Sequence, residues 1–406
     1  MTKEGFGRLV SLEEAIRLVN ENIPGLGDEE VKIPEALNRI LAEDVVAGID
    51  VPHFRKSAMD GFAVIARDTF GAGNTSPREL TIVDSISAGV VSRKKVVSGS
   101  CVELTTGAPM PEGADAVLMV EYTEREGDKL VIYKGVTPTE NVIGVGSDVA
   151  SGTKVFSKGT RLNPRYTGVL SSLGLSGVFV KKKPKVAVLS TGNEVMSAGT
   201  VLKKGKIYDI NSRTLIDSLR ERDCEVVDLG VARDNEKEIR ERISEGVKAS
   251  DLVLVSGGSS LGTEDLLVDV ITRLGELLVH GIAVKPGKPT IIGRVKNRLV
   301  IGLPGYPTSA LSNFYILIIP LLERMQGITS TENLVEAKLT RKIASTIGRY
   351  EFLSVKITTR NNKRYAEPVL RGSSAITTLA NADGFVAISE NTEVVNKGEI
   401  VEVNLF

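Results

Sequence analysis

The sequence contains 406 residues with a mass of 43.5 kDa, of which 42% are hydrophobic and 25% charged; this excludes global disorder and predicts roughly two to four domains. Lys and Arg together number 51, as do Asp and Glu, so the net charge of zero argues against a nucleic-acid-binding protein that depends on an overall basic field. The two cysteines, Cys101 and Cys224, exclude a disulfide framework, and two histidines, His53 and His280, are too few to favour a tetrahedral zinc site.

The N-terminal segment predicts an amphipathic helix and not a secretion signal. Ser11 is in position to cap this helix, with Glu14 three residues later as the partner of a capping box. The longest apolar run, 311–322, is too short to span a bilayer and contains polar residues and a proline. We therefore expect a cytoplasmic protein that does not associate with membranes.

The chain beyond this helix is predicted to be poor in helices up to residue 180. A short helix is expected over 33–41, with Pro34 near its first turn. Between 51 and 141, short β-rich runs alternate with Gly, Pro and Asp turns, which indicates a β-rich domain. Residues 142–180 are rich in Gly and Ser and predict turns with short strands.

The pattern changes at Lys181-Lys182-Lys183-Pro184, a charged run that reads most simply as a solvated linker. Buried-strand runs then alternate with helical segments, which predicts an α/β domain with a mostly parallel sheet covered on both faces. A last helix of this domain is expected over 308–325. The remaining segment, up to residue 406, is β-rich with regularly spaced turns and predicts a small β-barrel or sandwich.

Two polar loops follow strands of the predicted α/β domain, at the sheet edge where open sheets bind ligands. The first contains Ser190, Thr191, Gly192 and Glu194, and the second contains Ser256, Gly257, Gly258 and Ser259. Glycines let backbone amides approach an anion, and hydroxyls donate to phosphate. Either loop alone is better explained as a tight turn, but two such loops in one sheet favour an anion site.

Two later segments strengthen this hypothesis. The run Val284-Lys285-Pro286-Gly287-Lys288-Pro289 holds two lysines in a turn fixed by prolines, as in a phosphate or oxyanion clamp. A surface turn with solvated lysines is the alternative. The run 302–309 is a strand-to-helix elbow in which Pro304 precedes the turn and Pro307 suits the first helical turn, so that free amides face the strand ends. A helix cap without a ligand is the alternative there.

Acidic residues complete the set. Asp265 follows the glycine-rich loop and Asp234 follows another strand, where a carboxylate can hold Mg²⁺ against phosphates. Asp234 is equally well explained as a helix N-cap. In the β-rich domain, Asp60 lies in a small-residue turn, and Thr106 lies in a rigid turn that bears hydroxyls. On physical grounds alone Asp60 is a turn residue.

Six motifs, in the order SAMDGFAV, TTGAPMP, STGNE, SGGSSLGTED, AVKPGKP and GLPGYPTS, resemble those of the MoeA/gephyrin family, the molybdopterin molybdenumtransferases. The resemblance covers essentially the whole chain. It implies an enzyme that takes adenylylated molybdopterin and molybdate, releases AMP and forms molybdenum cofactor in a Mg²⁺-dependent reaction. It also implies an elongated homodimer whose active cleft combines the MogA-like α/β domain of one chain with the Asp-bearing domain of its partner.

The resemblance implies four domains: an elongated one made of 1–50 and 142–180, a β-rich one over 51–141, a MogA-like doubly wound α/β domain over 181–328, and a small β-barrel over 329–406. The residues that match the family's catalytic positions are Asp60, Thr106, Glu194, Asp234, Asp265 and Arg349. Those expected to bind substrate are Ser190, Thr191, Gly192, Ser256, Gly257, Gly258, Ser259, Lys285, Lys288, Pro304, Pro307 and Ser373. Asp60 and Asp265 are the expected metal ligands.

The sequence departs from the family pattern at two places. Tyr306 stands in the elbow where many bacterial members have Asn, and Leu353-Ser354 stands where many carry an arginine after a Glu-Phe pair. Other functions remain as alternatives: an adenylyltransferase acting one step earlier, a scaffold, or a homologue that inserts tungstate. The resemblance further suggests a MogA-like adenylyltransferase and apo-molybdoenzymes as partners, and neither nucleic acid nor membrane.

Overall fold

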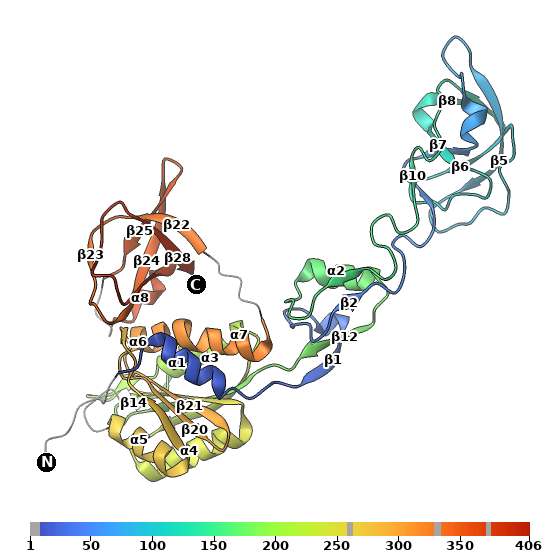
Figure 1. Cartoon of the computed structure of the whole chain (residues 1–406). Helices are drawn as coiled ribbons and strands as arrows, with labels where there is room; N and C mark the ends of the chain where they lie inside the picture. Colours follow the sequence, from blue (N-terminus) through green and yellow to red (C-terminus); the bar gives the residue numbers. More distant parts are fainter. Residues whose placement is uncertain (1–8, 258–262, 329–333, 371–374) are drawn as a thin grey trace, which may run out of the picture.

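The computed structural model describes residues 9–257, 263–328, 334–370 and 375–406, and the molecule is elongated (Figure 1). An α/β unit carries a C-terminal β unit on one side, and a slender arm leads from it to a small β unit at the opposite end of the molecule. The arm is built from two separate stretches of sequence that pair with each other. The small β unit is therefore an insertion between these stretches.

The α/β unit is built around a six-stranded sheet. Its first four strands are parallel, and the last two each run antiparallel to the preceding one. In spatial order the strands are β16 (Glu225–Ala232), β13 (Lys185–Thr191), β17 (Leu252–Ser256), β21 (Arg298–Leu303), β20 (Ile291–Val295) and β18 (Glu276–His280). The predicted doubly wound α/β domain is confirmed, with an antiparallel edge that the alternation of elements did not predict.

Helices cover both faces of this sheet, and each face has its own hydrophobic core. On one face lie α4 (Glu236–Ala249) and α5 (Thr263–Leu274). On the other lie α1 (Leu12–Glu21), α3 (Asn211–Glu221), α6 (Pro307–Asn313) and α7 (Ile319–Gln326). A π-helical turn (Phe314–Ile318) joins α6 to α7, so the helix expected over 308–325 is confirmed. Burial on both faces explains the continuous apolar runs over 186–189 in β13 and 252–255 in β17.

The first helix begins where the sequence predicts. The Ser11 hydroxyl accepts the backbone N–H of Glu14 at 3.1 Å, which caps α1. The apolar stripe of Leu12, Ala15 and Val19 is buried in the core of the α/β unit. The range 1–50 is thus divided in space: α1 lies on the α/β unit, and the strands that follow belong to the arm.

The arm consists of narrow pairs of strands. β1 (Asp28–Lys32) pairs antiparallel with β12 (Gly177–Lys181), and β2 (Val45–Val46) pairs with β11 (Lys154–Phe156). The lysine run at the boundary is not merely solvated, because Lys181 pairs with Asp28 at 2.5 Å and Lys183 with Asp223 at 2.6 Å. The second of these ion pairs joins the end of the arm to the α/β unit.

Two helix predictions in the arm were wrong. The helix expected over 33–41 is only a 3-10 turn at Ile33–Glu35, because Asn38 adopts a left-handed φ of 67° that helical geometry does not allow. Conversely, α2 (Pro164–Ser172) lies in the stretch that we expected to form turns and short strands. Asn163 caps this helix and Pro164 occupies its first turn.

The small β unit holds Asp60 and Thr106 in its loops. Its sheet contains, in spatial order, β7 (Ala116–Met119), β4 (Gly61–Val64), β6 (Ser100–Leu104), β5 (Arg78–Ile86), β9 (Lys129–Ile132) and β8 (Thr123–Glu126). A short pair, β3 (Lys56–Ser57) with β10 (Val142–Ile143), connects it to the arm. The β-rich pattern of 51–141 therefore corresponds to one sheet with apolar side chains packed on both faces.

The C-terminal unit is a closed barrel. Five strands form the ring, because the first and the last pair with each other: β24 (Tyr350–Arg360), β25 (Lys363–Pro368), β22 (Leu334–Leu339), β28 (Ile400–Leu405) and β26 (Gly384–Ile388). A short helix, α8 (Thr377–Ala380), lies between β25 and β26. The predicted barrel is confirmed. Tyr315 from the α/β unit packs on Phe406 of the barrel, with ring centroids 4.5 Å apart, and this aromatic contact joins the two units.

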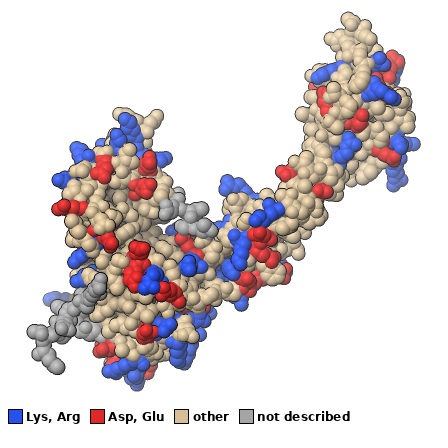
Figure 2. Space-filling model, in the orientation of Figure 1, with Lys and Arg blue, Asp and Glu red and all other residues tan. Residues whose placement is uncertain are grey.

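The surface carries both signs of charge. On the face seen in Figure 2, basic and acidic side chains are both scattered over the α/β unit, the C-terminal unit, the arm and the small β unit, in keeping with the equal numbers of the two kinds. Within the described ranges, the structure contains no helix of the length and apolarity that a membrane crossing requires.

Candidate functional site

A pocket of about 380 Å³ opens at the carboxyl ends of the parallel strands of the α/β unit. Its floor is the end of β13 and the end of β17, which bring the two predicted polar loops together. The predicted site residues among those that line it are Ser190, Thr191, Gly192, Glu194, Asp234, Ser256, Gly257 and Pro307. Eight of the predicted site residues thus line one pocket, although the two loops that supply most of them lie more than sixty residues apart in the sequence.

Two buried polar atoms in this pocket have no hydrogen-bond partner, the hydroxyl of Ser190 and Oδ1 of Asp234. The other oxygen of Asp234, Oδ2, accepts the backbone N–H of Asn193 at 3.1 Å. Asp234 does not cap the following helix, because Asn235 does so by accepting the N–H of Glu238. Unpartnered polar atoms are costly when they are buried, so these two indicate a place where a polar ligand binds.

Glycine is required where the two loops touch. Gly257 has a φ of 132°, and a Cβ at this position would lie 2.1 Å from the carbonyl oxygen of Thr191. Gly192 has a φ of 146°. Both residues adopt a backbone conformation that other residues rarely adopt. The close approach of the two loops keeps the pocket floor narrow and lined by backbone.

Several lining residues were missed by the sequence analysis. Asn211, the first residue of α3, donates from Nδ2 to the Ser256 hydroxyl and to the Gly305 carbonyl, at 2.8 Å each, and so ties the second loop to the elbow. Asp209, two residues before α3, accepts the N–H and the hydroxyl of Ser212 in the first turn of this helix. A short flap formed by β14 (Val195–Met196) and β15 (Ile207–Tyr208) overhangs the pocket. The sequence Asp209-Ile210-Asn211-Ser212 is typical of a helix N-terminus, and it could have indicated that polar side chains at the start of α3 face the pocket.

The elbow closes the pocket on a third side. Pro304 is buried, and Pro307 is the first residue of α6, as predicted. Tyr306 is 51% exposed and lines the pocket, so the residue that departs from the family pattern lies where it can contact a ligand. Ile376 of the C-terminal unit lines the same pocket. The Thr308 hydroxyl donates to the Ala375 carbonyl at 3.4 Å, which holds the two units together there.

The two predicted clamp lysines lie in the loop between β18 and β20. This loop is at the end of the sheet where the parallel strands also finish, the end at which the pocket opens. Lys285 donates to Glu351 of the barrel at 3.2 Å, and its side chain is 42% exposed. The Lys288 carbonyl accepts the N–H groups of Ile282 and Thr290. Gly287 between them packs against Asn313, whose side-chain amide donates to the Gly287 carbonyl at 2.9 Å. The turn is thus rigid, but Lys285 already has an acidic partner.

Asp60 and Thr106 form one contact, although they lie in different loops of the small β unit. Oδ1 of Asp60 accepts the backbone N–H of Thr106 at 2.6 Å and its hydroxyl at 2.8 Å. These hydrogen bonds lower the pKa of Asp60 from its ordinary value. The unit that carries them lies at the far end of the molecule from the α/β unit (Figure 1). Within one chain, therefore, the pair does not reach the strand-end pocket.

The remaining predicted residues are placed only in part. Arg349 lies in the turn that leads into β24, two residues before Glu351. Asp265 belongs to α5, but its side chain lies outside the described part of the structure. Gly258, Ser259 and Ser373 also lie outside the described residues.

The carboxylates of the strand-end pocket fit a magnesium ion that takes its remaining ligands from the substrate and from water. Among the described residues no group of three or more Asp, Glu, His or Cys side chains gathers as a metal site. Glu194 and Asp234 nevertheless both line the pocket, and Asp234 has an unpartnered oxygen. Mg²⁺ is usually bound through one or two carboxylates together with water and substrate phosphates. A third lining carboxylate, Asp209, already accepts hydrogen bonds from Ser212, so Glu194 and Asp234 are the two that remain for such an ion.

Comparison with known proteins covers nearly the whole chain. Residues 10–174 match the MoeA N-terminal region (domain I and II), 187–324 the probable molybdopterin binding domain, and 336–406 the MoeA C-terminal region (domain IV). The molybdopterin molybdenumtransferases of Haemophilus influenzae and Bacillus subtilis are 33% and 32% identical over 98% of this chain, and 99% and 94% of those proteins are covered. The crystal structure of the MoeA molybdopterin biosynthesis protein from Pyrococcus horikosii is 43% identical, with a TM-score of 0.87 over 98% of this chain and 99% of that one.

Proposed function

Since the chain belongs to the MoeA family of molybdopterin molybdenumtransferases, enzymes of molybdenum cofactor biosynthesis, we propose that it inserts molybdate into adenylylated molybdopterin and releases AMP. The observation that carries this proposal is the strand-end pocket with its unpartnered Ser190 hydroxyl and Asp234 oxygen. A pocket lined by glycine loops, hydroxyls and carboxylates suits a phosphate-bearing substrate that brings a cation with it.

The residues of the pocket have separate tasks in this proposal. Ser190, Thr191 and Ser256 donate hydrogen bonds to phosphate oxygens, and Gly192 and Gly257 let the backbone approach them. Asn211 fixes the position of the second loop relative to the elbow, because its side chain donates a hydrogen bond to each. Tyr306 and Ile376 provide apolar surface for the rings of the nucleotide or pterin. Catalysis by such a site depends on positioning and on charge neutralisation.

Glu194 and Asp234 line this pocket and would hold Mg²⁺. Asp265, in the first turn of α5, is proposed as a further ligand. When bound, the ion supplies positive charge between two substrates that are both anions. Lys285, Lys288, Arg349 and Ser373 are proposed to receive molybdate. In that case molybdate competes with Glu351 for the Lys285 ammonium group, since the two groups pair in this structure.

The distance between Asp60 and the pocket supports a site shared by two chains. Asp60 and Thr106 lie at the far end of the arm (Figure 1), so a homodimer is needed if they act on the same substrate. Asp60 of one chain would then serve as a further metal ligand at the pocket of its partner. Light scattering should give about twice 43.5 kDa, and a monomer that retains full activity would refute the shared site.

An assay of AMP release separates this function from its alternatives. The purified chain is incubated with adenylylated molybdopterin, Mg²⁺ and molybdate, and AMP is measured. We expect AMP release that depends on molybdate. An adenylyltransferase would instead convert ATP and molybdopterin to the adenylylated pterin without molybdate, and a scaffold would do neither. Replacing molybdate by tungstate in the same assay identifies the preferred oxyanion.

A further inference from the structure

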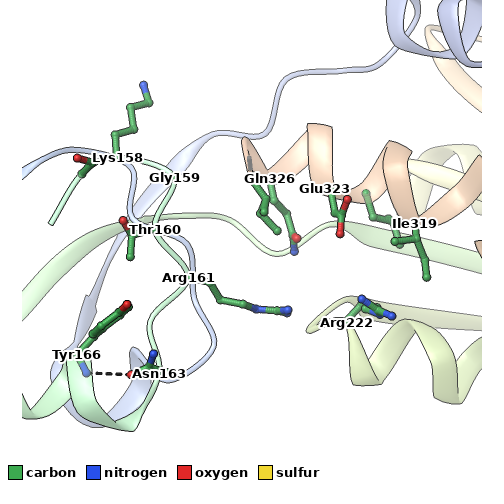
Figure 3. A pocket seen from close by; sticks show the side chains of 13 residues that line it. Lys158, Gly159, Thr160, Arg161, Asn163, Tyr166, Arg222, Ile319, Glu323 and Gln326 are labelled. Carbon is green, nitrogen blue, oxygen red and sulfur yellow. Dashed lines mark hydrogen bonds between the residues drawn. The ribbon is translucent and has the colours of Figure 1, made fainter. Parts of the chain in front are cut away.

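A second cavity, of about 510 Å³, lies at the joint between the arm and the α/β unit. One wall is the segment 157–166 of the arm, and the other is formed by α7 and by Arg222 at the end of α3. Figure 3 shows these walls facing one another. The cavity contains none of the residues of the strand-end pocket, so it is a separate feature of the molecule.

The charges in this cavity are unbalanced. Its charged lining residues are Lys158, Arg161, Arg222 and Glu323, which gives three positive charges and one negative charge, or a net charge of +2. Arg161 extends from the arm across the cavity toward Arg222 of the α/β unit (Figure 3). Among the described residues, neither guanidinium group forms an ion pair with a carboxylate. Two like charges directed into one recess repel each other unless an anion lies between them.

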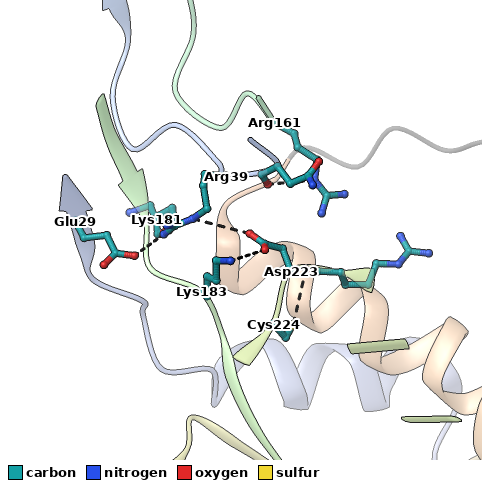
Figure 4. Close-up of polar contacts among 9 residues, drawn as sticks. Glu29, Arg39, Arg161, Lys181, Lys183, Asp223 and Cys224 are labelled. Atoms are coloured by element: carbon teal, nitrogen blue, oxygen red, sulfur yellow. Dashed lines mark hydrogen bonds and ion pairs between the residues drawn. The ribbon is translucent and has the colours of Figure 1, made fainter. Parts of the chain in front are cut away.

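The neighbouring carboxylate, Asp223, is already occupied. Its Oδ1 pairs with Lys183 at 2.6 Å, and its Oδ2 lies 3.9 Å from Nε of Arg39 (Figure 4). Arg39 is nearly buried and also pairs with Glu29. The joint therefore contains one network in which cations and carboxylates are matched, next to a pair of arginines that has no such partner.

Further lining groups suit a small organic anion. Asn163 uses its side-chain oxygen to cap α2, because this oxygen accepts the N–H groups of Arg165 and Tyr166, so its amide N–H groups remain to donate into the cavity. Tyr166, Ile319 and Leu322 add an apolar wall. Guanidinium groups bind phosphate through paired hydrogen bonds, and a phosphate dianion would balance the net charge of +2.

We propose that this cavity binds a small phosphate-bearing anion, either inorganic phosphate or a phosphate ester, between Arg161 and Arg222. The ligand would bridge the arm and the α/β unit, since one arginine comes from each. Binding would therefore hold the arm in one orientation relative to the α/β unit and stabilise the joint by mass action. This inference is independent of the proposed reaction, because it concerns other residues.

Isothermal titration calorimetry on the full chain tests the proposal, with inorganic phosphate and glycerol 3-phosphate as separate ligands at constant ionic strength. We expect each of Arg161→Ala and Arg222→Ala to weaken binding about tenfold or more, since a hydrogen bond to a charged group contributes about 1.5–3 kcal/mol. The ligand that binds the parent protein more tightly identifies the source of the phosphate. Arg165→Ala is the matched control, because Arg165 is exposed on α2 and does not line the cavity.

Two outcomes would overturn the proposal. If both arginine variants bind phosphate as tightly as the parent and the Arg165→Ala control, the anion binds elsewhere, such as at the strand-end pocket. If light scattering shows that both variants lose a dimer that phosphate does not affect, the arginines meet a second copy of the chain instead of a small anion. Circular dichroism of each variant establishes that the comparison is made on folded protein.

Discussion

Thr106 donates its backbone N–H and its hydroxyl to the same carboxylate oxygen of Asp60, at 2.6 and 2.8 Å. Asp60 lies immediately before β4, and Thr106 follows β6, so the sheet of the small β unit brings the two loops together. Both hydrogen bonds favour the ionised carboxyl group, and they lower its pKa. The pair thus presents a charged carboxylate in a fixed orientation on the surface of this unit.

Replacing Thr106 by valine should raise the pKa of Asp60 part of the way toward the ordinary value of about 3.9. The backbone N–H, which is the larger cause of the lowered pKa, remains in this variant. A lowered pKa means that the stabilising contact is present above the pKa of the unfolded chain and is lost as the pH falls through the folded value. NMR titration of the Asp60 carboxyl carbon measures the shift. An unchanged pKa would mean that the hydroxyl does not contact the carboxylate in solution.

Asp234→Asn should lower the rate of AMP release by about a hundredfold, as loss of one preorganised electrostatic group typically does. The side chain keeps its shape, but it loses the negative charge that would attract a cation to the unpartnered oxygen. Initial rates over a range of Mg²⁺ concentrations check this, and the Mg²⁺ requirement should rise as well. Asp269→Asn, an exposed position on α5, is the control and should behave as the parent. Equal rates in both variants would remove Asp234 from the site.

Lys285→Ala should raise the molybdate concentration needed for half-maximal AMP release while the fold is retained. Its partner Glu351 is mostly buried. Glu351→Gln removes the charge of that partner and leaves the lysine in place, so comparing the molybdate requirements of the two variants separates the two roles of Lys285. If Lys285 serves only the ion pair, the two variants should show the same defect. If it binds molybdate, Glu351→Gln should instead keep or lower the molybdate requirement, because the lysine is freed from its partner. Lys342→Ala, at an exposed position of the barrel, should leave the requirement unchanged.

Gly257→Ala should destabilise the α/β unit by about 1–3 kcal/mol, because the position combines a left-handed φ with a Cβ clash against the Thr191 carbonyl. Gly168→Ala is the matched control. That glycine lies inside α2 with open space around it, so alanine there should stabilise the helix by about 0.5–1 kcal/mol. Denaturant unfolding monitored by circular dichroism measures both changes. The same sign for both substitutions would contradict the strained-turn account.

Much of the fold could be predicted because the relevant signals are local. The alternation of buried strands and helices identified the α/β unit, Ser11 marked the start of α1, and Pro307 marked the start of α6. The family resemblance of six motifs is confirmed by matches along nearly the whole chain. The helix predicted over 33–41 is absent because Asn38 has a left-handed φ, and α2 was not predicted because Asn163 starts it within a Gly-rich stretch.

The candidate site was harder to predict where it depends on contacts between distant segments. The strand-end loops were found because glycines and hydroxyls at strand ends form a recognisable pattern. The roles of Asn211 and Ile376 could not be predicted, since they follow from how α3 and the barrel pack against these loops. Nothing in the sequence near Lys285 indicates that Glu351, 66 residues later, is its partner.

We propose that this chain couples the insertion of molybdate to the release of AMP, and a single-turnover experiment measures this coupling. In a single turnover with enzyme in excess over adenylylated molybdopterin, AMP and pterin-bound molybdenum are quantified in the same samples. We expect one AMP for each molybdenum inserted, with both products absent when molybdate is omitted. Release of AMP at the same rate without molybdate, or formation of pterin-bound molybdenum without AMP, would contradict it.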